Sequence, residues 1–254
     1  MPKGLSDRDA VSVPIGVGTA VDALFNILGF SFSAAGLEGR DATGVPILIW
    51  GGASAVGAAT IQVAKAAGFG PIFTAASPRN HESLVKVGAS QVFDYNSPTV
   101  VEDIRHAVAR SGKKLTVVFD AVSAGLGPLA SPSKNKDANN TPDLARRCVS
   151  DDVPAEDLLL SSVLPVAHDP AWKLCIGLRP YGDSFFFNGP VQQDPLFPVR
   201  MKAYMDWFVA NHETVWQPIL RNTIVHGAEK GIEEIRRVAD GGTSREKVLI
   251  ARPI

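Results

Sequence analysis

The sequence predicts an α/β fold built on a doubly wound parallel sheet. Short apolar runs alternate with helix-like segments between residues 45 and 122, as in successive βαβ units. A glycine-rich turn, Gly51-Gly52, follows the first apolar run. The chain has 254 residues, of which 45% are hydrophobic, so it can bury a sizeable core in one large domain or two small ones.

The first half of the chain supplies the alternating elements. Ser6 begins a polar helix cap, and apolar residues then recur at helical spacing as far as Gly29. Continuous apolar runs that are short and bounded by turn residues are typical of buried parallel strands. We expect strands over 45–50, 71–77, 90–95 and 114–122, and helices over 57–68, 79–88 and 99–112.

The alternation breaks after residue 122. Residues 123–142 are rich in Ser, Gly, Pro, Asn and Lys, which predicts a flexible surface loop. Residues 180–200 are also typical of a loop, with aromatic side chains that pack against the core. We expect helices over 143–149, 202–212 and 227–242, and strands over 157–166 and from Lys247 to the end.

Composition excludes several classes of function. The formal net charge of −1 argues against nucleic acid or an anionic membrane as the main partner. Two cysteines, Cys148 and Cys175, are too few for a disulfide framework or a zinc cluster, so we expect core thiols and no metal. The polar start lacks signal-peptide features, and no apolar run approaches the roughly 20 residues of a membrane span. These features predict a soluble, cytoplasmic protein.

The glycine turn has several possible chemistries. A nucleophile elbow needs G-x-S-x-G, but Val56 stands where its second glycine belongs. A phosphate-binding P-loop needs Lys and Ser/Thr after its last glycine, but Ala58-Ala59 follow Gly57. A glycine corner that binds nothing remains an alternative.

A dinucleotide fingerprint, G-x-G-x-x-G, fits better. Gly52, Ser54 and Gly57 match it with serine in the middle position, between a buried strand and a helix. Gly52 permits the turn and Gly57 permits close packing of the helix. The helix N-terminus then offers free N–H groups and a positive dipole end to a pyrophosphate. The sequence therefore predicts a Rossmann-type dinucleotide site.

The end of the second strand indicates which dinucleotide. An NAD site usually has an acidic residue there for the ribose 2′-hydroxyl, but this strand ends in "FTAASPRN". Ser77, Arg79 and Asn80 offer a cation and hydrogen-bond donors, which suit a 2′-phosphate. We therefore predict NADPH. An ordinary exposed charge at the start of a helix is the alternative interpretation of Arg79.

The blocks "VPILIWGGASAVGAATIQVAKAAGF", "FTAASPRNHESLVKVGASQVFDY" and "VFDAVS" resemble the medium-chain dehydrogenase/reductase superfamily, which descends from zinc-containing alcohol dehydrogenases. The resemblance is closest to the zinc-free quinone oxidoreductases and the trans-acting enoyl reductases of fungal secondary metabolism. "VSVPIGVGTAVDALF" and "GIEEIRRVADGGTSREKVLIARP" resemble the segments before and after that family's cofactor domain.

The resemblance implies a role for each matching residue. Thr19 would approach the nicotinamide carboxamide and Tyr95 the adenosine phosphate, although a helix-face threonine and a packed aromatic are the plainer interpretations. Residues 176–182 match the family's corresponding segment poorly. The implied cofactor contacts are Ser54, Ala55, Val56 and Gly57 at the pyrophosphate, Ser77, Arg79 and Asn80 at the 2′-phosphate, Tyr95, Thr19, and Thr243 and Ser244 in a C-terminal loop.

The resemblance also implies a domain plan. Family members begin with a GroES-like β-barrel, and this chain starts close to the cofactor domain, so we expect remnants of a truncated GroES-like domain at both ends. Residues 1–40 would be a lead-in helix segment from the catalytic domain. Residues 41–200 would form the dinucleotide-binding domain, with a flexible insertion at about 124–142, and residues 201–254 would join the barrel.

The implied function is an NADPH-dependent enoyl or quinone reductase of secondary metabolism. Its partner would be a small-molecule substrate, free or carried by a polyketide synthase, and the chain would be a monomer or homodimer. No residue stands out as catalytic. A non-catalytic NADPH-binding protein is the alternative. A short-chain dehydrogenase is excluded, because Tyr-x-x-x-Lys is absent: Tyr95, Tyr181 and Tyr204 are followed four positions later by Thr99, Phe185 and Phe208.

Overall fold

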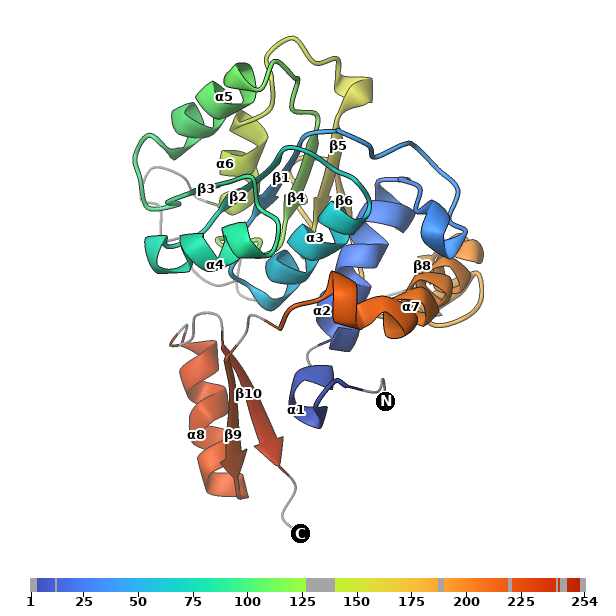
Figure 1. The fold of residues 1–254 in the computed structure, drawn as a ribbon, viewed down its shortest axis with the longest axis vertical. Coiled ribbons are helices and arrows are strands. Elements are labelled where there is room, and N and C mark those ends of the chain that lie inside the picture. The colour runs from blue at the N-terminus through green and yellow to red at the C-terminus, as the bar shows by residue number, and fades with distance from the viewer. Residues whose placement is uncertain are drawn as a thin grey trace.

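A six-stranded parallel sheet forms the centre of the computed structural model, which describes residues 4–11, 13–126, 140–186, 190–218, 221–240, 242 and 246–251 (Figure 1). The strand order β3-β2-β1-β4-β5-β6 is that of a Rossmann fold, so the predicted fold class is confirmed. The strands are β1 (Ile47–Trp50), β2 (Ile72–Ala75), β3 (Gln91–Phe93), β4 (Val117–Asp120), β5 (Leu159–Ser162) and β6 (Trp172–Leu174).

The sheet is buried on both faces. Ile47 and Ile49 of β1 belong to one hydrophobic core, whereas Leu48 and Trp50 belong to a second, because successive side chains of a strand point to opposite faces. The first core is covered by α2 (Val13–Val21), α3 (Ala55–Ala66), α4 (His81–Lys86) and α7 (Leu196–Val215). The second is covered by α5 (Val100–Arg110) and α6 (Thr141–Arg147).

The helix expected to run as far as Gly29 changes from an α-helix to a π-helix after Val21. After α2 the chain continues as a π-helix, Asp22–Ile27, in which the N–H of Leu28 donates to the carbonyl of Ala23. Such segments are rare and often lie at functional sites. The apolar spacing could not reveal this change.

The region predicted as a loop over 180–200 contains regular structure. Strands β7 (Ser184–Phe186) and β8 (Pro190–Gln192) pair antiparallel, and α7 begins at Leu196 rather than at residue 202. Pro198 is tolerated in the first turn of α7 because its missing N–H would have no helical partner there. The domain boundary expected at residue 200 therefore falls inside a helix.

The C-terminal residues form a separate βαβ unit that extends from the body of the molecule (Figure 1). Strands β9 (Arg221–His226) and β10 (Glu246–Ala251) pair in parallel, and α8 (Ala228–Ala239) connects them. Gly231 is the buried position of α8, where an added Cβ would lie 3.2 Å from the Ile250 side chain.

The remaining described elements are short: α1 (Asp7–Ala10) and the 3₁₀ turns Ser33–Ala35, Pro78–Asn80 and Ala155–Asp157. Most of the predicted loop over 123–142, namely 127–139, lies outside the described residues. Regular structure resumes where Asn140 caps α6 by accepting the N–H of Asp143. Within the described ranges, no helix combines the length and apolar character that a membrane span needs.

Cys148 and Cys175 are buried free thiols, as expected, and burial raises the pKa of each to about 12. The described part of the chain brings together no cluster of three or more His, Cys, Asp or Glu side chains that could hold a metal ion.

Candidate cofactor site

The glycines of the turn after β1 are required by its geometry. Gly51 has a φ of 82°, a conformation that favours glycine. A Cβ on Gly52 would lie 2.1 Å from the Thr74 hydroxyl oxygen, and a Cβ on Gly57 would lie 2.3 Å from the Gly51 carbonyl oxygen. Side chains here would push α3 away from the end of β1. The turn is therefore built for close approach, as the fingerprint predicts.

Ser54 caps α3 and leaves two backbone donors available. Its hydroxyl oxygen accepts the N–H of Gly57 at 2.9 Å. The N–H groups of Ala55 and Val56 have no acceptor among the described residues, and both residues are partly exposed. Free N–H groups at the N-terminus of a 12-residue helix form an anion site. Of the four predicted pyrophosphate residues, Gly57 alone has its N–H engaged by Ser54.

The turn after β4 packs beside the glycine turn, and Asp120 organises it. The buried Asp120 carboxylate accepts the N–H groups of Val122 at 3.0 Å and Ser123 at 2.9 Å, and the Thr141 hydroxyl at 2.5 Å. Burial raises the pKa of this carboxyl. A Cβ on Gly51 would lie 2.6 Å from the Val122 side chain, so the two turns are in contact.

Asp120 is a residue that the sequence analysis did not single out. The sequence does mark this residue, because Asp120 is an acidic residue at the end of the apolar run "VVFD" of the fourth strand. Its partners Ser123 and Thr141 could not be read from the sequence. The Asp120 carboxylate is fully buried, so it can stabilise the turn after β4 but cannot contact a ligand.

Two residues predicted for the adenosine end are in direct contact. Ser77 follows β2 and Tyr95 follows the neighbouring β3, and their hydroxyl oxygens lie 2.9 Å apart. The Tyr95 ring also packs against the second core, so it is a packed aromatic whose hydroxyl lies beside that of Ser77. Arg79 is exposed, and its guanidinium has no ion pair within the described ranges. Asn80 is only 4% exposed, so its side chain is largely enclosed.

Thr19, which was predicted for the nicotinamide end, lies on α2. Its hydroxyl donates to the Ile15 carbonyl at 2.7 Å, which is the local bond of a helix-face threonine. A Cβ on Gly177 would lie 2.4 Å from the Thr19 hydroxyl oxygen, so the loop after β6 rests directly on this residue. Thr243 and Ser244, the other predicted contacts, lie outside the described residues.

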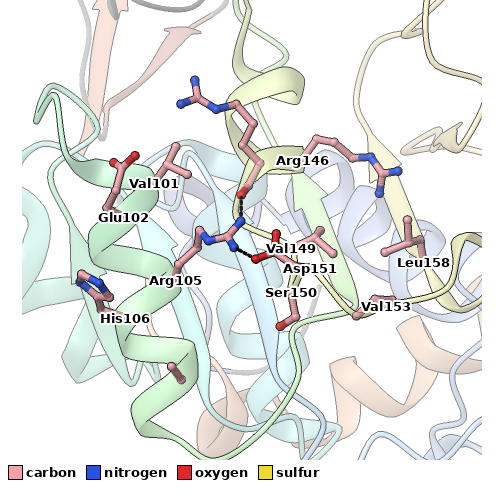
Figure 2. A pocket seen from close by; sticks show the side chains of 12 residues that line it. Val101, Glu102, Arg105, His106, Arg146, Val149, Ser150, Asp151, Val153 and Leu158 are labelled. Atoms are coloured by element: carbon pink, nitrogen blue, oxygen red, sulfur yellow. Dashed lines mark hydrogen bonds and ion pairs between the residues drawn. The ribbon is translucent and has the colours of Figure 1, made fainter.

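A separate groove of about 800 Å³ lies between α5 and the segment that leads from α6 into β5 (Figure 2). Figure 2 shows Arg105 at its centre, where the guanidinium donates to the Arg147 carbonyl at 3.2 Å and pairs with Asp151. Ser150 accepts the N–H of Leu115, which precedes β4, so the groove reaches the amino ends of the strands. The glycine turn is at their carboxyl ends. None of the described cofactor-site residues lines the groove.

Comparison with known proteins agrees with this geometry. Residues 55–127 match the zinc-binding dehydrogenase family model. The dehydrogenase pigH of Monascus ruber is 41% identical over 107 residues, which are 42% of this chain and 29% of that protein. The trans-enoyl reductase fsa3 of a Fusarium strain is 44% identical over 105 residues, or 41% of this chain and 29% of that protein.

Solved structures share the fold along almost the whole chain. The CurK enoyl reductase superposes with a TM-score of 0.61 at 16% identity, covering 100% of this chain and 65% of that one. An alcohol dehydrogenase superfamily protein from Novosphingobium aromaticivorans superposes with a TM-score of 0.62 at 16% identity, covering 98% of this chain and 65% of that one.

These comparisons agree with the predicted resemblance to the medium-chain dehydrogenase/reductase superfamily, in its enoyl reductase-like branch. The predicted resemblance is therefore confirmed. The chain therefore spans well under half the length of these curated relatives: the matched segments make up 29% of pigH and 39% of the trans-enoyl reductase TOXD of Cochliobolus carbonum. This fold implies a nicotinamide cofactor, and the glycine cradle with its two free N–H groups fits a pyrophosphate.

Proposed function

We propose that the chain binds NADPH and belongs to an NADPH-dependent reductase that acts on a small metabolite or polyketide intermediate of secondary metabolism. The proposal rests on two features of the same sheet edge: the glycine turn at the start of α3, and the polar residues that follow β2 and β3. Ala55 and Val56 present free N–H groups, and Ser77, Tyr95 and Arg79 present hydroxyls and a cation at a strand end that lacks an acidic residue.

The chain's residues would hold the two ends of the cofactor. The N–H groups of Ala55 and Val56 would donate to the pyrophosphate, assisted by the positive end of α3. Arg79 would pair with the 2′-phosphate, and the hydrogen-bonded hydroxyls of Ser77 and Tyr95 would donate one hydrogen bond to it. Asp120 would hold the neighbouring turn in place. Thr19 would lie beside the nicotinamide carboxamide.

The cofactor, when bound, supplies a hydride. We propose an activated C=C bond conjugated to a carbonyl as the acceptor, because curated relatives include trans-enoyl reductases. A substrate of this kind, free or carried as a thioester by a polyketide synthase, needs a dry cleft and correct positioning more than a strong acid. No described residue of the site is assigned as the catalytic group.

Turnover tests the activity separately from binding. Oxidation of NADPH by the purified 254-residue chain would be followed with a panel of enoyl thioesters, enones and quinones, with Gly57→Ala as the inactive comparison. NADPH oxidation that depends on an enoyl substrate supports the reductase. Saturable NADPH binding with no turnover on any acceptor would instead favour a non-catalytic NADPH-binding protein.

A further inference from the structure

A buried ion pair joins the π-helix to the loop after β6. The Arg179 guanidinium donates to the Asp22 carboxylate twice, from Nε to Oδ1 at 2.5 Å and from Nη2 to Oδ2 at 2.8 Å. The Asp22 side chain is 0% exposed and the Arg179 side chain 4%. Two parallel bonds of this kind fix direction as well as distance.

The remaining polar atoms of the pair are also engaged. Asp22 accepts the backbone N–H of Ile176 at 2.8 Å and the side-chain amide of Asn26 at 2.8 Å. Arg179 donates to Gln193 at 3.3 Å and lies over the Phe197 ring, 5.0 Å from its centroid. Because desolvation offsets much of the attraction in a buried pair, such a pair is better suited to fixing a geometry than to adding stability.

The loop held by this pair lies beside the candidate cofactor site. Helix α2 contacts both: a Cβ on Gly16 would lie 3.2 Å from the Ala55 carbonyl oxygen, and a Cβ on Gly18 would lie 2.4 Å from the Gly177 carbonyl oxygen. Two residues correspond to a rise of about 3 Å along the axis of an α-helix. Residues two apart point to different sides of a helix, so α2 packs one side against the start of the pyrophosphate helix and another against the loop at Gly177.

Asp22 lies one helical turn beyond Gly18 and Thr19. Residues three and four apart share a helix face, so the face that contacts Gly177 also presents the carboxylate that holds Ile176 and Arg179. The loop is therefore held at two points, by a close backbone contact with α2 and by an ion pair with the π-helix that continues it.

The loop lies on the half of the sheet opposite the adenosine corner. Ser77 and Tyr95 end β2 and β3, whereas the loop follows β6 at the other end of the strand order. A dinucleotide spans the carboxyl edge of both halves, so its nicotinamide lies toward β4, β5 and β6.

We propose that Asp22 and Arg179 are positioning residues that hold the Ile176–Pro180 loop against the nicotinamide half of the bound cofactor. This inference rests on the proposed function, since it needs a bound dinucleotide. According to this proposal, the ion pair increases the affinity for the nicotinamide end of the cofactor, in addition to any effect on folding.

Arg200 provides a matched control. It is also a partly buried arginine that bonds to the π-helix region, donating to the Phe25 carbonyl at 2.8 Å and the Glu38 carbonyl at 2.9 Å. It makes no bond to residues 176–180 in the described part of the chain. Arg200 also donates to Asn26 at 3.3 Å, so Arg200→Lys perturbs the same helix and a neighbour of Asp22 while both members of the Asp22–Arg179 ion pair are kept.

The test compares two ligands, NADPH and 2′-phospho-ADP-ribose, which lacks the nicotinamide. Both would be titrated into the full chain and into its Arg179→Lys, Asp22→Asn and Arg200→Lys variants. We expect Arg179→Lys and Asp22→Asn to weaken NADPH about tenfold while leaving 2′-phospho-ADP-ribose within about twofold. Arg200→Lys should leave the ratio of the two affinities unchanged, even where it lowers the thermal midpoint.

Two results would overturn the inference. One is equal weakening of both ligands by Arg179→Lys and Asp22→Asn, which is the behaviour of a purely structural pair. The other is unchanged NADPH affinity in folded variants. Should one variant not fold, the other still gives the ratio. A wild-type chain that binds neither ligand overturns the proposed function itself, and the inference with it.

Discussion

The hydroxyl oxygens of Ser77 and Tyr95 lie 2.9 Å apart, although the residues are 18 positions apart in the sequence. Each follows one of two neighbouring parallel strands, so strand pairing brings them together. In a hydrogen-bonded pair of hydroxyls one donates to the other, so one O–H remains to donate to a further acceptor. Beside the exposed Arg79, they make a corner suited to a phosphate oxygen.

This contact predicts coupled losses of NADPH affinity. Tyr95→Phe and Ser77→Ala should each weaken NADPH binding about three- to tenfold, because each removes one hydroxyl from the 2′-phosphate corner. The double variant should lose less than the product of the two single losses, since the hydroxyls also orient each other. Fluorescence titration of NADPH in all four chains measures the coupling. Strictly multiplicative losses would show that the hydroxyls act independently.

Gly57→Ala should abolish cofactor binding and destabilise the fold. The new Cβ would lie 2.3 Å from the Gly51 carbonyl oxygen, so α3 or the turn must shift, at a cost of about 1–3 kcal/mol. Gly70→Ala is the control, because a Cβ there meets no atom within 4 Å. Chemical denaturation gives the free energy of unfolding and titration gives the affinity. A Gly57→Ala chain with wild-type stability and affinity would contradict the steric account.

Substitutions of Ser54 separate the helix cap from the anion site. Ser54→Ala should cost about 1 kcal/mol of unfolding free energy, because the Gly57 N–H loses its acceptor. Ser54→Asp should restore the cap but place a negative charge where the pyrophosphate is proposed to bind. We therefore expect Ser54→Asp to be about as stable as wild type yet to bind NADPH much more weakly. Equal NADPH affinity in the two variants would place the pyrophosphate elsewhere.

The C-terminal βαβ unit should lose stability in acid. Hydrogen bonds from Arg237, and then from Thr223, lower the pKa of Glu246 to about 2. A carboxyl whose pKa is lower in the folded chain stabilises that chain when ionised. This contribution is full above the ordinary value of about 4.5 and is lost as pH falls from there toward about 2.

Hydrogen exchange of the β9 and β10 amides, measured between pH 5 and pH 2, checks this dependence. Glu246→Gln should remove the acid-dependent change in opening free energy, whereas Glu229→Gln, an exposed position on α8, should preserve it. Parallel opening free energies in the wild-type and Glu246→Gln chains across that range would contradict the assignment.

The sequence was sufficient for elements that depend on local pattern. The apolar runs over 45–50, 71–77 and 114–122 predicted strands, and Gly52, Ser54 and Gly57 predicted the turn, because backbone geometry restricts which residues fit there. Periodicity could not reveal contacts between distant residues. Arg179 bonds to Asp22 across 157 positions, and no local pattern specifies that approach.

The errors have a similar cause. Strands β7 and β8 are only three residues each, which is too short for an alternation to be recognised. The helix predicted over 202–212 begins earlier, at Leu196, because Pro198 is compatible with the first turn of a helix. Strand β9 is defined by its parallel pairing with β10, which lies 20 or more positions further along the chain.

The central claim is that this chain has an NADPH site with Arg79 at the 2′-phosphate. The most direct measurement is a titration of the wild-type chain and its Arg79→Gln variant with NADPH and NADH, with Arg110→Gln as the control for surface charge. We predict that wild type and Arg110→Gln bind NADPH at least tenfold more tightly than NADH, and that Arg79→Gln removes most of this difference. Equal affinity of the wild-type chain for both cofactors, or no binding of either, would contradict the claim.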